Sequence, residues 1–217
     1  MSVVYTQPLP RPVITEGDVP ASGELLVPRG AIITDSARDA ARARGVNIRE
    51  VAPEDAKQKP APDRIVAIGS DHGGFQMKQR LKPVLSDLGL HAEDVGTADT
   101  QPADYPDIAE KVAVMVARGE AARGVIIDGA GIGSCIAANK VPGIRAALCY
   151  DKASARNSRE HNDSNVLTLG GRLLTESVAE DVLRVWLTTP FGGGRHQGRV
   201  QKIAEIERRY SNWTPRS

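Results

Sequence analysis

Residues 124–140, GVIIDGAGIGSCIAANK, constrain the fold more than any other part of this chain. The apolar run from Val125 to Ile127 is typical of a strand buried on both faces. A glycine-rich turn follows, and the small and apolar residues from Ile136 to Ala138 indicate the start of a helix. A buried strand, a tight turn and a helix in this order predict part of a parallel sheet covered by helices.

The turn itself offers binding chemistry. Its glycines, Gly129, Gly131 and Gly133, let the backbone come close to a ligand. The N–H groups of such a turn and of the first helical turn lack internal partners, so they point at an anion or oxyanion above them. Asp128 occupies the last strand position beside this cradle, where its carboxylate could act on a bound substrate.

Two other interpretations of this turn stay open. One is a tight strand-to-helix turn that merely needs glycines, since a single glycine run is weakly specific. The other is a dinucleotide fingerprint, supported by Asp151 about 20 residues further on. Ser134 stands where that fingerprint requires its third glycine, so we rank a dinucleotide site second.

From Arg64 onward, segments with strand and helix patterns alternate along the chain. Apolar positions at helical spacing, such as Met77, Leu81 and Val84, predict a first helix with one buried face. The predicted strands are residues 65–68, 91–95, 125–127, 145–149 and 166–169, and the further helices are residues 108–117, 153–159 and 177–187. Such alternation implies right-handed crossovers and a parallel sheet with helices on both faces.

The first 60 residues have a pattern of their own. Residues 24–28 predict a short strand and residues 37–44 a helix, and residues 57–63, KQKPAPD, have the composition of a linker. We therefore divide the chain into an N-terminal extension, residues 1–60, and a larger domain, residues 61–217. An extension this small buries little core alone and is expected to dock on something.

Charge and cysteine content narrow the class of partner. The formal net charge is +1, so nothing favours a nucleic-acid or membrane surface. No apolar stretch approaches the roughly 18 residues that span a membrane, and the first residues lack the basic start and apolar core of a signal peptide. Cys135 and Cys149 form neither a disulfide framework nor a metal-binding spacing. We therefore expect a cytoplasmic protein with a small-molecule ligand and no metal.

Ligands of parallel sheets bind at the carboxyl ends of the strands. Polar groups stand there in this sequence: Asp71 and His72 after the first strand, Asp128 at the end of the central strand and Arg172 after the last strand. His161 stands instead between a helix and the last strand, at the far end of that helix. Two of the four histidines thus fall among polar clusters, which favours a catalytic site over a purely structural role.

The C-terminal segment after Phe191 is rich in glycine and basic residues. Arg195, His196 and Arg199 lie within five residues. On a helix start, Arg195 and Arg199 share a face that can fork onto one phosphate. A solvated charged helix end is the alternative, but the preceding glycines favour a loop that faces a ligand.

Several motifs occur together in the order of a known family. They are Asp71-His72-Gly73-Gly74, Asp104-Tyr105-Pro106, Gly129-x-Gly131-Ile-Gly133, Ala137-Ala138-Asn139-Lys140, Gly143-Ile-Arg145-Ala146, Ser158-Arg159-x-His161-Asn162-Asp163, Asn165-Val-Leu and Gly193-Gly-Arg195-His196-x-x-Arg199. Over about residues 64–210, this set resembles the ribose-5-phosphate isomerase B family, which includes galactose-6-phosphate isomerases.

The resemblance implies a Rossmann-like three-layer αβα sandwich with a five-stranded parallel sheet and no bound nucleotide. It also implies a homodimer or tetramer with active sites at the subunit interface. Members interconvert aldose and ketose phosphates without a metal or another cofactor. A sugar phosphate is therefore the ligand that this resemblance predicts.

The same resemblance assigns roles to individual residues. His161 would open the sugar ring with help from Asp71, and Tyr105 would line the sugar pocket. The backbone from Gly129 to Ser134 would stabilise the enediolate oxygen. A further set would hold the substrate and its phosphate, some of its members reaching in from the neighbouring subunit: His72, Asn162, Arg172, Arg195 and Arg199.

The chain departs from the family at the catalytic base. One branch of the family has a cysteine where this chain has Asp128, and another has glycine there and a glutamate where this chain has Ser134. A threonine or serine that commonly assists the enediolate is replaced by Ala130. Cys135 is one residue beyond Ser134 and points about 100° away on a helix, so we assign it to packing.

Three hypotheses follow. In the first, Asp128 is the general base and moves a proton between C2 and C1 of a sugar phosphate, ribose 5-phosphate first of all, through a cis-enediolate. In the second, the changed base and Ala130 select another sugar phosphate, such as a tetrose, deoxy or hexose species. In the third, the chain is a catalytically silent sugar-phosphate-binding or assembly subunit. We prefer the first, because a silent scaffold need not keep His72, His161 and the C-terminal arginines.

The N-terminal extension has a resemblance of its own. Residues 25–46, LLVPRGAIITDSARDAARARGV, are similar to N-terminal segments of several enzymes of bacterial microcompartments. This resemblance implies that residues 1–60 bind a microcompartment shell or a partner enzyme and place the chain inside such a compartment. A docking arm specific to this family is the alternative.

Overall fold

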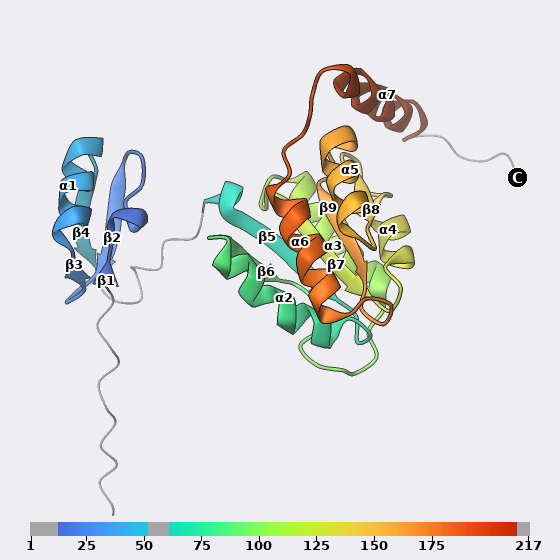
Figure 1. The fold of residues 1–217 in the computed structure, drawn as a ribbon, viewed down its shortest axis with the longest axis horizontal. Helices are drawn as coiled ribbons and strands as arrows, with labels where there is room; N and C mark the ends of the chain where they lie inside the picture. Colours follow the sequence, from blue (N-terminus) through green and yellow to red (C-terminus); the bar gives the residue numbers. More distant parts are fainter. Residues whose placement is uncertain (1–12, 52–60, 212–217) are drawn as a thin grey trace, which may run out of the picture. The chain divides into compact units, whose positions relative to one another are not determined.

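The computed structural model describes residues 13–51 and 61–211. The chain divides into two compact units, residues 1–59 and 60–217, and each is described by itself (Figure 1). The linker expected at residues 57–63 falls partly outside the described ranges, and its end forms a short 3₁₀ helix, Pro62–Arg64. Within the described ranges, no helix has the length and apolar character needed to cross a membrane.

The smaller unit consists of two pairs of parallel strands and one helix. Its elements are β1 (Val13–Ile14), β2 (Glu24–Pro28), β3 (Ile32–Ile33), α1 (Asp35–Arg44) and β4 (Asn47–Val51), with a 3₁₀ turn at Glu16–Asp18. β1 pairs with β3 and β2 with β4. The Thr34 side chain accepts the Ala37 N–H at the start of α1, and Gly45 ends the helix in the left-handed conformation. The strand and helix predicted for this unit are confirmed.

The larger unit is built around one five-stranded parallel sheet (Figure 1). Its strands, in spatial order, are β6 (His91–Asp94), β5 (Ile65–Ser70), β7 (Arg123–Asp128), β9 (Val166–Gly170) and β8 (Ala146–Leu148). The helices are α2 (Phe75–Asp87), α3 (Tyr105–Ala117), α4 (Ile132–Ala138), α5 (Lys152–Asn162), α6 (Glu176–Thr188) and α7 (Arg195–Tyr210). The predicted α/β fold with a five-stranded parallel sheet is confirmed.

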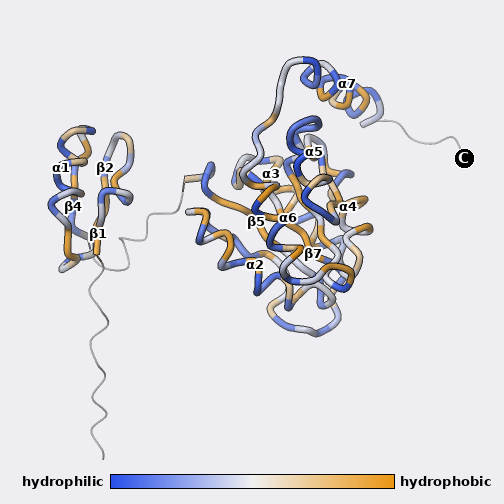
Figure 2. Tube along the Cα trace, viewed as in Figure 1, coloured by the Kyte–Doolittle hydropathy of each residue, from blue (hydrophilic) through white to orange (hydrophobic). Residues whose placement is uncertain are grey.

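Helices cover both faces of this sheet. On one face, Leu81 of α2, Ala155 of α5 and Leu183 of α6 belong to one buried apolar cluster with residues of the central strands. On the other face, Val112 of α3 and Ala138 of α4 pack with alternate residues of the same strands. Figure 2 shows apolar segments along β5 and β7 between these layers. Strands buried on both faces consist of unbroken apolar runs, which is why the sequence predicted them.

Helix α4 begins earlier than the sequence predicted. The prediction of a helix start at Ile136 was wrong, because α4 covers Ile132–Ala138 and Ile136 is exposed. The reason is Gly131, whose φ of 79° is left-handed and closes the turn at once. A Cβ at Gly131 would lie 2.5 Å from a side-chain carbon of Leu148 and 2.8 Å from the carbonyl carbon of Leu169. Only glycine fits there, so the turn lies tightly over the strand ends.

One charged side chain lies inside the apolar layer of α2. Lys78 is 1% exposed, and its Nζ donates to Oδ1 of Asp94 at 2.7 Å and to the carbonyl of Thr97 at 2.6 Å. Burial would raise the pKa of Asp94, but hydrogen bonds from Lys78 and Lys82 outweigh it and lower that pKa. The Lys78 ammonium thereby fixes the segment after β6, which leads to Tyr105 at the start of α3.

Candidate active site

Three neighbouring strands end at the same edge of the sheet and carry polar side chains there. Asp71 follows β5, Asp128 ends β7, and Arg172 lies two residues after β9. The strand registers pair the last residues of β5, β7 and β9 with one another or with a direct neighbour. The sheet therefore brings Asp71, Asp128 and Arg172 to one edge, here called the carboxyl edge.

The carboxylate of Asp128 lies inside the glycine-rich turn. Its Oδ1 accepts the N–H groups of Ala130, at 2.8 Å, and of Gly131, and its Oδ2 accepts the N–H of Ser134 at 2.9 Å. Asp128 is only 4% exposed, and these three hydrogen bonds satisfy its buried carboxylate. The turn thus wraps around Asp128, which engages three of the N–H groups expected to face a substrate oxyanion.

Part of the cradle is still open to a substrate. In residues 61–211, no protein acceptor pairs with the N–H groups of Gly129, Ile132 and Gly133. Ile132 and Gly133 belong to the first turn of α4, where N–H groups have no partner within the helix. Oδ2 of Asp128 accepts one hydrogen bond and keeps a lone pair that can take a proton.

Two side chains from other segments border the turn. Tyr105 lies so close to Gly133 that a Cβ added at this glycine would be 2.5 Å from the tyrosine ring. His72 is oriented by the N–H of Ala103, which donates to its Nδ1 at 3.4 Å. The segment that Lys78 fixes therefore holds both side chains at the carboxyl edge.

Arg172 extends over glycines of two strand ends. A Cβ added at Gly73 would lie 3.4 Å from its Nε and 3.3 Å from Oδ1 of Asp71, and one at Gly129 would lie 3.6 Å from its Cδ. Oδ1 of Asp71 accepts the N–H of Gly74 at 3.0 Å. Among the described residues, no carboxylate forms an ion pair with Arg172. An unpaired guanidinium beside open backbone is suited to a phosphate.

His161 and Asn162 lie at the opposite, amino edge of the sheet. Helix α5 runs from the carboxyl end of β8 back to Asn162, shortly before the amino end of β9. The His161 ring stacks on His196 of α7, with the ring centroids 4.1 Å apart and the planes 4° apart. Desolvation, followed by the charges of His161, Arg195 and Arg199, lowers the pKa of His196.

The predicted site residues of one chain therefore fall into two separate groups, here called half-sites. The carboxyl edge carries Asp71, His72, Tyr105, Asp128 and Arg172, and the other half-site carries His161, Asn162, Arg195 and Arg199. The expected help of Asp71 to His161 is not possible within one chain, because the length of β9 separates the two edges. A strand of five residues spans about 16 Å, which is too far for a hydrogen bond.

Two features of the carboxyl edge were missed at the level of sequence. Lys78 fixes the segment before Tyr105, and its signal is a lysine beside Met77 on the apolar face of α2. The hydroxyls of Ser70 and Ser134 are buried and have no hydrogen-bond partner within the described residues.

In residues 13–51 and 61–211, no three metal-binding side chains are grouped closely enough to hold an ion.

The chain matches one family model and is similar in sequence and structure to several known proteins. The family model described as Ribose/Galactose Isomerase matches residues 66–203. Ribose-5-phosphate isomerase B of Escherichia coli (strain K12) is 44% identical over 144 residues, 66% of this chain and 97% of that protein. D-erythrulose-4-phosphate isomerase of Pectobacterium atrosepticum is 37% identical over 143 residues, 65% of this chain and 94% of that protein. The structure of Clostridium thermocellum ribose-5-phosphate isomerase B is similar with a TM-score of 0.66 and 49% identity, covering 67% of this chain and 99% of that one.

The parallel sheet and its strand-end site, together with these matches, define the protein as a sugar phosphate isomerase. The chain belongs to the ribose/galactose isomerase family. The family expected from the motifs of the larger domain is thus confirmed. The family match begins at Val66, so the smaller unit lies outside it.

Proposed function

We propose that this chain interconverts an aldose phosphate and a ketose phosphate through a cis-enediolate, with Asp128 as the general base. The position of Asp128 carries this proposal. It ends the central strand beside N–H groups that can hold an oxyanion, and its Oδ2 accepts a single hydrogen bond. A carboxylate placed in this way can remove the proton from the carbon next to the carbonyl and return it to the neighbouring carbon.

The backbone donors of the turn would act on the charge that this proton transfer moves. Three N–H groups donate to the Asp128 carboxylate and fix its orientation. As Oδ2 takes the proton, negative charge passes to the substrate oxygen. The N–H groups of Ile132 and Gly133 are then the donors available to that oxygen.

We propose that the complete site forms between two copies of the chain, in a homodimer or a tetramer. One copy would supply the carboxyl edge, and the second would supply His161 for ring opening with Asn162, Arg195 and Arg199 for substrate and phosphate. The separation of the two half-sites in one chain supports this arrangement. The exposed apolar side chains of Ile203 and Ile206 on α7 also favour a covering subunit.

Ribose 5-phosphate is the substrate that we propose, with ribulose 5-phosphate as the product. The 44% identity to the Escherichia coli protein named ribose-5-phosphate isomerase B supports this choice. The Pectobacterium relative, named for a four-carbon sugar phosphate, keeps a tetrose phosphate as the alternative. Ala130 bears on the same question, because its methyl group cannot make the hydroxyl contact that a threonine or serine makes in the family. Deoxy and hexose phosphates complete the set of candidates.

A substrate panel tests this proposal. The kcat/KM of the full chain is measured for ribose 5-phosphate, ribulose 5-phosphate, erythrulose 4-phosphate and representative deoxy and hexose phosphates. We expect the kcat/KM for ribose 5-phosphate to be about tenfold or more above that for the four-carbon substrate. Enzymes discriminate on this scale between substrates that differ by one carbon unit. A preference for the four-carbon or another substrate would overturn the choice of ribose 5-phosphate but not the reaction class.

A second candidate function is sugar-phosphate binding without turnover. One observation favours it: Asp128 engages three N–H groups that would otherwise face an oxyanion. In that case the chain would bind the sugar phosphates of the panel and convert none of them. Conversion of any member of the panel would exclude this second function.

We propose a separate role for the smaller unit, namely attachment of the enzyme to a microcompartment shell or to a partner enzyme. The similarity of residues 25–46 to segments of microcompartment enzymes supports this role, as do the exposed apolar side chains of Val13 and Ile32. Removal of residues 1–60 is expected to abolish co-assembly with shell proteins and to leave kcat/KM unchanged. Lost activity with intact co-assembly would contradict this role.

A further inference from the structure

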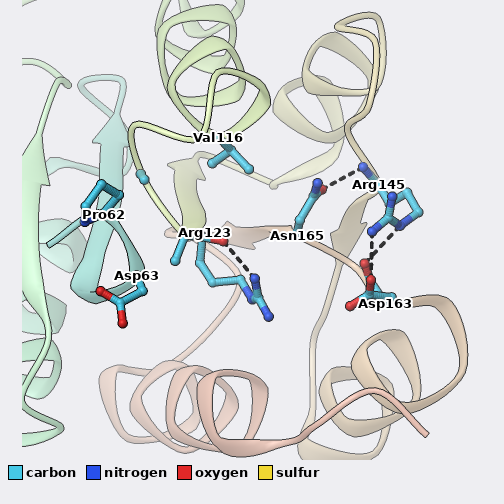
Figure 3. A pocket seen from close by; sticks show the side chains of 10 residues that line it. Pro62, Asp63, Val116, Arg123, Arg145, Asp163 and Asn165 are labelled. Carbon is cyan, nitrogen blue, oxygen red and sulfur yellow. Dashed lines mark hydrogen bonds and ion pairs between the residues drawn. The ribbon is translucent and has the colours of Figure 1, made fainter. Parts of the chain in front are cut away.

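A cavity of about 320 Å³ opens at the amino edge of the sheet of the larger unit (Figure 3). The start of β7 and the segments before β8 and β9 line it with polar side chains, which are those of Arg123, Arg145, Asp163 and Asn165. None of the residues assigned above to the substrate lines this cavity. Its volume is at the lower end of the range for small-molecule sites.

Asp163 is fully engaged by two arginines. Its Oδ2 accepts Nη2 of Arg145 at 2.9 Å, and its Oδ1 accepts Nη1 of Arg159 at 2.8 Å. The main chain holds Arg145 as well, since its Nε donates to the carbonyls of Asn162 and Asp163. One carboxylate therefore balances two guanidinium groups, and this end of the cavity already has an excess of positive charge.

Arg123 adds a third guanidinium to the cluster. Its Nη1 donates to the carbonyl of Ala122 at 2.7 Å, and in the described part of the chain no carboxylate forms an ion pair with it. Figure 3 shows its side chain reaching into the cavity. Asp63 lines the same cavity, but it is exposed and makes no ion pair with Arg123. Desolvation, followed by the charge of Arg159, lowers the pKa of Arg123.

We propose that this cavity, here called the Arg123 cavity, binds a small phosphate-bearing anion. The free N–H groups of the Arg123 fork would accept it in the two-bond geometry that guanidinium groups make with phosphate oxygens. Arg145 lines the same cavity, and its Nη1, which has no hydrogen-bond partner among the described residues, can add a further contact. An anion bound there would offset the positive charge of the three neighbouring guanidinium groups, which the carboxylate of Asp163 balances only in part.

Calorimetric titration with inorganic phosphate tests this site. The background is the full chain with Arg172→Met and Arg195→Met, which removes an arginine from each half-site of the active site. Phosphate is expected to bind this background, and the added change Arg123→Met is expected to weaken that binding at least tenfold, since a charged double contact is lost. Arg118→Met is the matched control: this exposed arginine is near Arg123 in sequence but does not line the cavity.

Three results would overturn the proposal. They are an absence of phosphate binding in the background, an equal loss of affinity with Arg123→Met and Arg118→Met, and unchanged affinity with Arg123→Met. Arg123→Lys keeps the charge without the planar fork and gives a second readout if the methionine variant does not fold. We expect it to weaken binding at least threefold, and unchanged affinity would again overturn the site. A parallel titration with glycerol 3-phosphate distinguishes a phosphate ester from the free ion.

Discussion

Replacement of Asp128 by asparagine is expected to lower kcat for isomerisation by about 10³-fold, because an amide cannot accept the proton from the substrate carbon. Binding of the sugar phosphate is expected to persist, since His72 and Arg172 are unchanged. The side-chain amide of the asparagine keeps one oxygen that accepts the N–H groups of Ala130 and Gly131. Its NH₂ group faces the N–H of Ser134, so the hydrogen bond from Ser134 is lost. Steady-state kinetics and a direct binding titration separate the two effects.

Asp128→Cys is the control for disturbance of the turn. A thiolate can accept a proton, and cysteine is the residue that one branch of the family carries at this position. We expect its kcat to exceed that of Asp128→Asn at least tenfold, provided that thermal unfolding shows both variants to be folded. Full kcat in Asp128→Asn would show that another group is the base.

Replacement of His161 by alanine is expected to lower kcat about 10²-fold or more, because ring opening needs an acid or base at this position. A stronger consequence follows from the two half-sites. Chains with Asp128→Asn and chains with His161→Ala, each nearly inactive alone, are expected to recover up to about a quarter of the activity when co-expressed. Half of randomly formed twofold dimers are mixed, and each mixed dimer has one intact site.

The matched control for this experiment combines Asp128→Asn with Asp71→Ala. Both side chains lie at the carboxyl edge of the same chain, so a mixed dimer of these variants has no intact site. We expect no recovery from this pair. Activity restored equally by both pairs, or by neither, would contradict a site shared between two copies. Two affinity tags on the co-expressed chains allow the mixed assembly to be purified before the assay.

Much of the larger unit could be predicted from sequence, because its central strands are buried on both faces. Unbroken apolar runs such as Val125–Ile127 are typical of such strands, and helices at regular intervals between them require parallel pairing. The start of α4 could not be predicted in this way. It depends on the left-handed conformation of Gly131 and on the close approach of Leu148. The local pattern of apolar residues indicates neither of these features.

The candidate site was predictable to a similar extent. The sequence places Asp71, Asp128 and Arg172 at one edge, because parallel strands end together. The three hydrogen bonds to Asp128 depend on the path of the turn and are visible only in three dimensions. The same holds for Arg123, whose lack of an acidic partner follows from the arginines that surround Asp163.

The most direct test of the central claim is to incubate the full chain with ribose 5-phosphate in D₂O and to follow the sugar by NMR. Proton transfer through an enediolate is expected to produce ribulose 5-phosphate with solvent deuterium at C1, since a proton held by a carboxylate can exchange with solvent. Asp128→Asn is expected to incorporate almost none. If the chain binds the sugar phosphate, yet neither converts it nor exchanges any carbon-bound hydrogen, the account of Asp128 as a general base is contradicted.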